Sequence, residues 1–152
     1  MTLPKLDDKG IITACAQCGQ KNRLPYAKLT DPATCGQCGA ALSLPSVPLD
    51  VASAAQWESL STSPLPVVVD FWAPWCGPCQ MVAPEVAKVA HSNVGRWLVV
   101  KINTEALPAL GARFGIQSIP TMAVFRGGKE AARTSGARPA PAIETWVRQA
   151  LG

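Results

Sequence analysis

The sequence has no run of eighteen apolar residues, the length that a helix needs to cross a bilayer, so we expect no transmembrane helix. Its first ten residues contain Lys5, Asp7, Asp8 and Lys9 and lack the apolar stretch of a secretory signal. A long basic run is absent too, because the net charge is only +4 and Lys and Arg are spread along the chain. These absences argue against membrane and nucleic-acid partners and predict a cytoplasmic protein.

The chain does contain ample apolar residues and six cysteines. Hydrophobic residues make up 48% of its 152 residues and charged residues 16%, which suits a globular protein with a core. This length allows one medium domain, or a small domain with an additional module. The cysteines form three C-x-x-C pairs, and in the reducing cytoplasm such pairs bind metal or carry out redox chemistry more often than they stabilise a fold.

Two of these pairs lie near the N-terminus and repeat the pattern C-x-x-C-G, at residues 15–19 and 35–39; we call these two turns knuckles. Sixteen residues separate Cys18 from Cys35, a spacing typical of a zinc site with four thiolate ligands. Four thiolates complete a tetrahedral shell and leave no position for water, so we expect one structural zinc ion. A disulfide pair and inert thiols are the alternatives. The candidate ligands are Cys15, Cys18, Cys35 and Cys38.

The segment between the knuckles is poor in large apolar residues, the main ones being Leu24, Tyr26 and Leu29. Such a short segment cannot bury much core, so we expect it to depend on its metal for folding. Residues 43–48 are rich in proline and indicate a linker or a first edge strand. We therefore expect an N-terminal module at residues 1–44 and a C-terminal domain at residues 45–152.

The third pair, Cys76 and Cys79, follows the apolar run of residues 67–71 and precedes a helical pattern of apolar residues. It therefore lies at the start of a helix, where unpaired N–H groups and a partial positive charge favour a thiolate. Two cysteines so placed can attack a foreign disulfide and resolve the mixed disulfide internally. We expect Cys76 to be exposed and nucleophilic, and Cys79 to be buried with a higher pKa; the alternative is half of a zinc site.

The remaining pattern predicts a mixed sheet with helices on both faces. Asp50 is expected to cap a helix that contains Trp57, and residues 65–71 indicate a central strand covered on both faces. The helix after Cys76 should run to about His91, to which we assign no role, and should kink at Pro84. The other expected elements are a strand at residues 97–102, a short helix at residues 107–114, a hairpin of residues 121–125 and 130–134, and a terminal helix at residues 143–151.

The run DFWAPWCGPC, at residues 70–79, resembles the active site of the thioredoxin family. The resemblance continues through residues 101–103, 119–121 and 135–137 and covers roughly the last two-thirds of the chain. It implies an α/β thioredoxin fold for the C-terminal domain. With a four-cysteine segment in front, the chain resembles the zinc-containing thioredoxin 2 type.

The resemblance also implies roles for residues around the cysteines. Asp70 matches an aspartate that assists the buried cysteine, and a buried carboxyl can exchange a proton near neutral pH; the alternative is an acid that reaches solvent. Lys101 matches a lysine near that carboxylate, although a solvated lysine is an equal alternative. Pro120 matches a cis-proline that faces the cysteines, with an ordinary trans turn as the alternative.

An apolar rim that accepts protein substrates is implied for the residues around this loop. Trp72 is expected to lie in the core instead. Gln80 departs from the family, which often has lysine or arginine there, and we expect this change to tune potential or partner choice. The expected substrate-binding residues are Trp75, Gly77, Pro78, Ile119, Gly136 and Ala137.

The expected function is protein-disulfide reduction by a monomer that acts on disulfide-containing proteins. An NADPH-dependent thioredoxin reductase is the partner that the resemblance implies, and we expect zinc but no bound organic cofactor. One alternative is a disulfide isomerase or oxidase. Another is a zinc ribbon that recruits a partner, with secondary redox activity.

Overall fold

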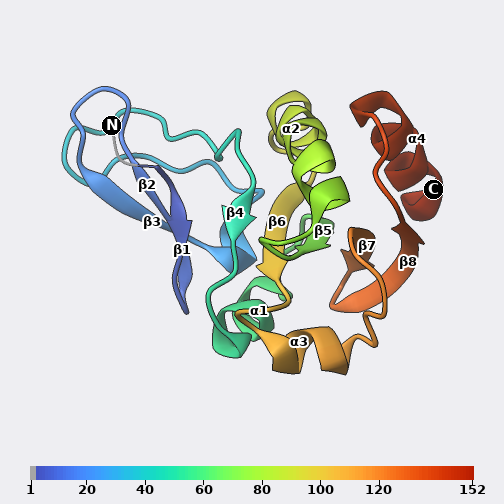
Figure 1. The fold of residues 1–152 in the computed structure, drawn as a ribbon. Helices are drawn as coiled ribbons and strands as arrows, with labels where there is room; N and C mark the ends of the chain where they lie inside the picture. Colours follow the sequence, from blue (N-terminus) through green and yellow to red (C-terminus); the bar gives the residue numbers. More distant parts are fainter. Residues whose placement is uncertain (1–2) are drawn as a thin grey trace.

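The computed structural model describes residues 3–152, which form two sheets and four α-helices (Figure 1). The N-terminal sheet is antiparallel, and its order is β1-β2-β3; the second sheet is mixed, and its order is β4-β6-β5-β7-β8. The strands are β1 (Lys5–Leu6), β2 (Gly10–Ala14), β3 (Lys21–Pro25), β4 (Leu49–Asp50), β5 (Val67–Trp72), β6 (Leu98–Asn103), β7 (Thr121–Arg126) and β8 (Lys129–Ser135). The helices are α1 (Ala54–Leu60), α2 (Gly77–Ser92), α3 (Pro108–Arg113) and α4 (Ala140–Leu151), with a 3₁₀ turn at Tyr26–Lys28.

Strand β5 lies at the centre of the mixed sheet, parallel to β6 and antiparallel to β7. Successive side chains of a strand point to opposite faces, so its two sets of residues enter different layers. Val68 packs in the cluster that α2 and α4 cover, whereas Val69 and Phe71 pack with residues of α1 and α3. The predicted central strand, covered on both faces, is confirmed, and so is the mixed sheet between two layers of helices.

The predicted elements of the C-terminal domain occur within three residues of the expected positions, and the largest difference is at the start of α4. The helix after the cysteine pair ends at Ser92, and Pro84 lies inside it. The prediction that Asp50 caps α1 is wrong, because Asp50 belongs to the edge strand β4, where it pairs with Lys101. Ser53 is the cap: its hydroxyl accepts a hydrogen bond from the N–H of Gln56 at 3.1 Å.

The three strands of the N-terminal module were not predicted from the sequence. The first knuckle connects β2 to β3, while the second is closed by an isolated antiparallel bridge between Thr34 and Ala41. Strands β1 and β2 join through a tight turn in which the carboxylate of Asp7 accepts hydrogen bonds from the N–H groups of Lys9 and Gly10. Backbone pairing therefore supplies much of the module's regular structure.

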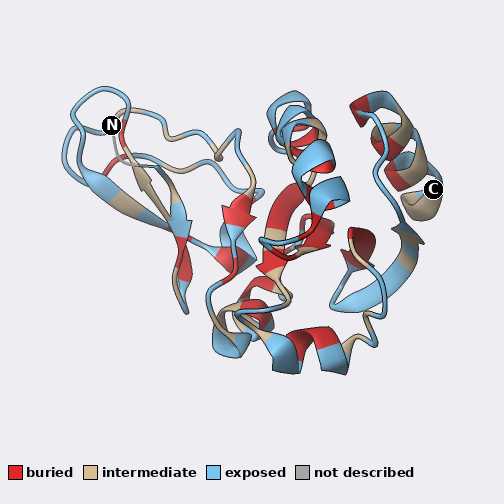
Figure 2. Ribbon diagram, viewed as in Figure 1, coloured by how far each residue is buried: buried red, intermediate tan, exposed pale blue. Residues whose placement is uncertain are grey.

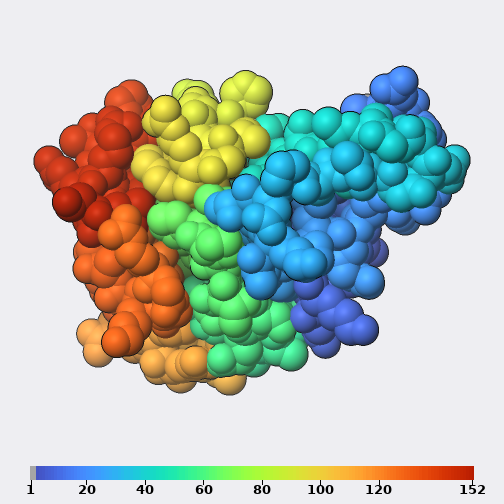
Figure 3. Space-filling view, turned by 180° about the vertical axis from the view of Figure 1, so that it is seen from behind, coloured from blue at the N-terminus to red at the C-terminus, as the bar shows by residue number. Residues whose placement is uncertain are grey.

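The module does not bury its apolar residues by itself. They form one continuous cluster with residues of β4 and α1, and the side chain of Gln56 on α1 donates a hydrogen bond to the carbonyl oxygen of Leu6 at 3.3 Å. Buried residues accordingly lie where the module faces β4, and in the view from behind its atoms abut those of α1 (Figures 2 and 3). The buried module residues of this cluster are Leu6, Ile11, Leu24, Tyr26 and Leu29.

Within residues 3–152, none of the helices combines the length and the apolar character that crossing a bilayer requires.

Candidate functional site

The cysteine pair lies at the N-terminus of α2, directly after the loop that leaves β5. Cys76 is the N-cap of the helix, and its sulfur accepts a hydrogen bond from the N–H of Cys79 at 3.2 Å. Pro78 lies in the first turn, where its missing N–H costs no intrahelical hydrogen bond. The two cysteines form a disulfide with their Cα atoms 5.2 Å apart, so the structure represents the oxidised state.

Both cysteines are buried, and the expected exposure of Cys76 is therefore wrong. Cys76 is 5% exposed and Cys79 is 3% exposed, because Trp72, Ala73 and Ile119 pack around them. Position still distinguishes the two sulfurs. Cys76 lies outside the first turn, with its Sγ 3.8 Å from the carbonyl oxygen of Ile119, whereas Cys79 belongs to the helix itself.

The loop that faces Cys76 contains Pro120. The Ile119–Pro120 peptide bond is cis, as the resemblance implied, and the carbonyl oxygen of Pro120 accepts a hydrogen bond from the N–H of Gly136 at 2.9 Å. Gly136 has a φ of +96°, a conformation that side-chain-bearing residues rarely adopt. Gly136 and Ala137 are exposed, and Ile119 is half-buried beside the disulfide. The structure thus brings the cis-proline loop and the cysteine pair together.

Asp70 lies in the middle of β5, between Lys101 of β6 and Met122 of β7. It is 1% exposed, so the alternative of an acid that reaches solvent is wrong. Within residues 3–152, neither oxygen of this carboxyl has a hydrogen-bond partner. Burial raises the pKa of Asp70 to about 6, and the charge of Lys101 opposes this rise. Asp70 shares a strand face with Val68, which packs in the α2 layer, so this titrating group lies beneath the cysteine-bearing helix.

Lys101 is placed by the ring of Trp72. Its ammonium nitrogen lies 4.7 Å from the ring centroid, within the range of a cation–π interaction. Trp72 is only half-buried and packs against Cys76 and Cys79, so the expectation that it belongs to the core holds in part. Lys101 therefore lies next to Asp70 on the neighbouring strand and against the ring of Trp72, while its role in the reaction stays a prediction.

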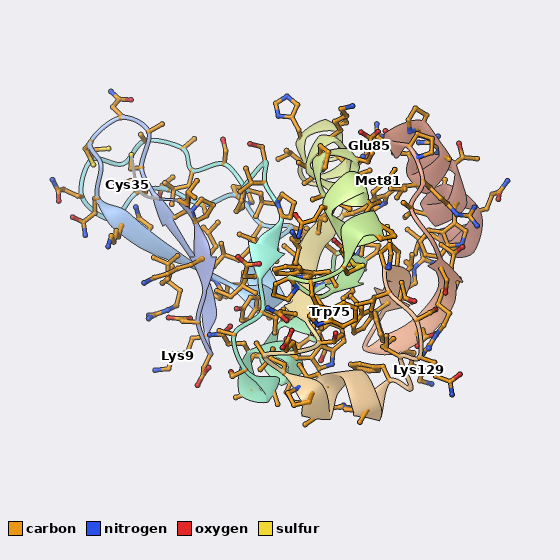
Figure 4. The ribbon with its side chains drawn as sticks, viewed as in Figure 1. Lys9, Cys35, Trp75, Met81, Glu85 and Lys129 are labelled. Atoms are coloured by element: carbon orange, nitrogen blue, oxygen red, sulfur yellow. A yellow bond between two sulfur atoms is a disulfide. The ribbon has the colours of Figure 1, made fainter. Side chains whose placement is uncertain are left out.

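The surface around the pair has two large exposed apolar side chains on or next to α2. Trp75 and Met81 are each 71% exposed; in Figure 4, Trp75 lies near the beginning of α2 in the middle of the view, and Met81 lies further up the helix. Trp75 was expected there, but Met81 was missed by the sequence analysis. The signal that could have found it is a methionine on the polar face of an amphipathic helix, two residues after Cys79. Gly77 and Pro78 are also exposed, so this face is available to a partner.

The four N-terminal cysteines come together as predicted, and all four sulfurs lie within 4.8 Å of one another. The sulfurs of Cys15 and Cys38 are 3.6 Å apart, and so are those of Cys18 and Cys35. A tetrahedron with zinc–sulfur bonds of 2.3 Å has edges of about 3.8 Å, so the sulfur positions fit a zinc ion. Each knuckle ends on a glycine with positive φ, at Gly19 and Gly39. The structure leaves all four thiols free, without disulfides among them.

One thiol of this cluster is markedly acidic. The backbone N–H groups of Cys38 and Gln37, together with the side-chain amide of Asn22, lower the pKa of Cys35 to about 6. These donors stabilise the thiolate, which is the form that binds a metal. At least one of the four candidate metal ligands therefore loses its proton readily.

Comparisons with known proteins agree with both parts of the chain. The thioredoxin family model matches residues 49–149, and a model described as "Thioredoxin 2, N-terminal" matches residues 14–40. Thioredoxin C-3 of Corynebacterium nephridii is 44% identical over 141 residues, which cover 93% of this chain and 96% of that protein. Thioredoxin 1 of Chlorobaculum tepidum is 47% identical over 95 residues, 62% of this chain and 94% of that protein.

Solved structures agree as well. A mutant thioredoxin from Halobacterium salinarum has a TM-score of 0.67 at 27% identity and covers 73% of this chain and 96% of its own. The fold, the geometry of the cysteine pair and the match over residues 49–149 lead to one conclusion: this chain belongs to the thioredoxin family.

Proposed function

We propose that this thiol–disulfide oxidoreductase reduces protein disulfides through Cys76 and Cys79. The Cys76 thiolate attacks one sulfur of a substrate disulfide, forms a mixed disulfide and releases the other substrate sulfur as a thiolate. Cys79 then attacks the Cys76 sulfur, the mixed disulfide breaks, and the second substrate sulfur leaves. Two electrons pass to the substrate, and the Cys76–Cys79 disulfide of the present structure is the product.

The observation that carries the assignment of roles is the position of Cys76 as the N-cap of α2. There the helix N–H groups stabilise its thiolate, as the hydrogen bond from the N–H of Cys79 illustrates. Substrate backbone would approach over the loop of Pro120, since the carbonyl of Ile119 lies beside the Cys76 sulfur. Trp75, Gly77 and Pro78, with Ile119, Gly136 and Ala137, would form the apolar rim.

Asp70 would take the proton that Cys79 must lose before it attacks. Its pKa of about 6 places the carboxyl near the midpoint of its titration close to neutral pH, which suits a group that accepts and returns a proton. Lys101, held over Trp72, would limit how far this pKa rises.

We propose zinc as the metal of the N-terminal module, one ion per chain, bound by Cys15, Cys18, Cys35 and Cys38. The support is the spacing of the sulfurs and the all-thiolate donor set, which suits a closed structural site. Metal analysis of the purified protein tests this; a metal-free, folded chain would contradict it. We propose further that residues 1–44 form the module and residues 45–152 the domain. The protein would be a cytoplasmic monomer, and an NADPH-dependent reductase would be its electron donor.

The catalytic proposal is tested with single cysteine variants and a protein disulfide such as insulin. Wild type should reduce insulin with dithiothreitol or a thioredoxin reductase. Cys79→Ser should accumulate a mixed disulfide with the substrate, because no resolving thiol remains, and Cys76→Ser should form none. Equal trapping by both variants would reverse or abolish the assigned roles. A reduction potential as high as that of periplasmic oxidants would favour the isomerase or oxidase alternative.

A further inference from the structure

The side chain of Asn22 connects the two halves of the metal site. Asn22 lies on β3, which leaves the first knuckle, yet its amide nitrogen is 3.5 Å from the sulfur of Cys35 in the second knuckle. Its amide oxygen accepts a hydrogen bond from the N–H of Gly36 at 3.0 Å. The same amide nitrogen also donates to the carbonyl oxygen of Gln20 at 2.9 Å, which orients the group.

The two knuckles are otherwise closely matched. Cys15 and Cys35 are buried, whereas Cys18 and Cys38 are exposed. In each knuckle the N–H of the glycine donates to the carbonyl of the first cysteine, at 2.8 Å in one and 2.9 Å in the other. The strand residues that flank each knuckle pair in the same way, Ala14 with Lys21 and Thr34 with Ala41.

The two knuckles differ at the residue that follows this pair in the chain. It is Asn22 after the first knuckle and Leu42 after the second. Leucine has no donor. Among the hydrogen bonds of residues 3–152, no side chain outside the four cysteines donates to the sulfur of Cys15, whereas Asn22 donates to that of Cys35. The N–H of Gln37 also donates to the Cys35 sulfur at 3.4 Å, but this bond lies within the second knuckle. Exposure and the glycine turns treat the knuckles alike, and Asn22 is the side chain that distinguishes them.

We propose that Asn22 is a positioning residue of the metal site. Because of its hydrogen bond to Cys35, the second knuckle keeps the metal longer, and the first knuckle releases it first. Four thiolates give a zinc site a net charge of −2, and a hydrogen bond from an amide withdraws charge from the sulfur that accepts it. That sulfur becomes a weaker base and a weaker nucleophile, so protons and electrophiles react more readily at the other thiolates. Because Cys38 shares a knuckle with Cys35, it remains bound as long as the second knuckle holds the metal. Cys18 is then the exposed thiol that is freed first.

The inference rests on the proposed zinc site and not on the disulfide reductase activity. It is tested on the full-length, zinc-loaded chain with Asn22→Asp, which keeps the acceptor for Gly36 but replaces the donor to Cys35 with a negative charge. Gln20→Glu is the matched control, because it makes the same amide-to-carboxylate change at an exposed side chain whose hydrogen bond goes to the carbonyl of Lys21. Asn22→Leu, which copies Leu42, serves as a second variant if Asn22→Asp does not fold.

The first measurement is zinc affinity by competition with a chelator. We expect a loss of about 10- to 100-fold for Asn22→Asp and a clearly smaller one for Gln20→Glu. The second is the order of labelling: zinc is withdrawn stepwise in the presence of N-ethylmaleimide, and the modified cysteines are identified by mass spectrometry. Cys18 should be labelled before Cys38 in the wild type and in Gln20→Glu, and the order should disappear in the Asn22 variants.

A zinc-loaded wild type in which Cys18 and Cys38 react together would overturn the inference alone. So would an order of labelling, or an affinity, that the Asn22 variants leave unchanged. A wild type that binds no zinc would instead overturn the zinc proposal, and this inference with it.

Discussion

At the scale of single residues, Asp70 has the most unusual environment in the molecule. It is the only charged side chain that is fully buried within residues 3–152, and its carboxyl oxygens have no hydrogen-bond partner there. A carboxylate buried in this way loses its hydration without compensation, so the protonated form is favoured. The protein thus holds a destabilising group at the centre of its sheet, directly under the redox helix.

This burial predicts how Asp70→Asn changes stability with pH. The pKa of Asp70 is about 6 in the folded protein and 3.8 in an ordinary setting, so between these values the folded state holds more protons than the unfolded state. The free energy of unfolding of the wild type therefore falls as pH rises through this window, by on the order of 3 kcal/mol in all at 1.36 kcal/mol per pH unit. Asparagine does not ionise, so the variant should gain stability relative to wild type from pH 4 to pH 7.

Urea denaturation of both proteins at the same pH values measures this difference, and the comparison cancels the pH dependence of the metal site. The control is Asp50→Asn, an exposed aspartate of the edge strand that also pairs with Lys101. Asp70→Asn should also reduce insulin more slowly near neutral pH, because the proton acceptor for Cys79 is gone. A more stable variant of full activity at every pH would show that Asp70 takes no part in the reaction.

At the scale of secondary-structure elements, the turn between β1 and β2 shows how closely the module is built. The side chain of Asp7 bonds the N–H groups of Lys9 and Gly10 and pairs with Arg23 across the sheet at 2.7 Å. At Gly10, the first residue of β2, the close approach of β3 depends on the absence of a side chain. A Cβ there would lie 2.3 Å from the carbonyl oxygen of Leu24. Strands β2 and β3 could not then keep their separation.

Gly10→Ala should therefore destabilise the module. The added methyl group meets backbone atoms, which cannot move aside without shifting the β2–β3 pairing, and overpacking of this kind costs about 1–3 kcal/mol. We expect a lower denaturation midpoint and faster loss of zinc to a chelator. Gly36→Ala is the control in the same module, since the nearest atom to its Cβ would be 3.8 Å away. Equal midpoints for the two variants would show that the close approach at Gly10 is not needed.

At the scale of the whole molecule, the two parts of the chain share one hydrophobic cluster. Residues of the module pack with Leu49, Val51 and Trp57, and the last of these also contacts Phe125 edge-on at 4.8 Å between ring centroids. The C-terminal domain has its own sheet and its own dithiol, so we expect it to fold without residues 1–44. The shared cluster indicates that it would do so at a cost, because removing the module exposes apolar surface next to β4 and α1.

A chain of residues 46–152 should accordingly unfold at a lower temperature than the full chain. Fully burying one large aliphatic side chain stabilises a fold by about 1.5–3 kcal/mol, and more than one side chain is uncovered here, so the loss should be at least about 2 kcal/mol. Thermal denaturation followed by tryptophan fluorescence measures it. Insulin reduction well below the transition should persist, since Cys76, Cys79 and Asp70 all lie outside the module. An unchanged midpoint would mean that the cluster contributes nothing to the domain, and an inactive but folded fragment would place the module in catalysis.

Local patterns in the sequence were enough for much of this protein. The spacing of the six cysteines predicted the cluster of four sulfurs and the pair at the start of α2, and the apolar runs located the strands and helices of the C-terminal domain, because both depend on residues near one another in the chain. The short strands of the module escaped prediction, since none is longer than five residues, β3 is mostly polar, and the sheet is held by backbone pairing and by the turn at Asp7. The cap of α1 was misplaced for a related reason: Asp50 and Ser53 both suit a cap, and pairing of β4 with β6 removed one of them.

The contacts between segments far apart in the chain were decided only by the tertiary structure. Whether Asp70 reaches water depends on α2 and the neighbouring strands, and whether Lys101 is solvated depends on the ring of Trp72. The link from Asn22 to Cys35 requires the two knuckles to meet, and the shared cluster requires the module to lie against β4. The sequence by itself determined which groups this protein has and which short elements bear them. The burial and charge that set their chemistry come from packing between elements far apart in the chain, which no local pattern records.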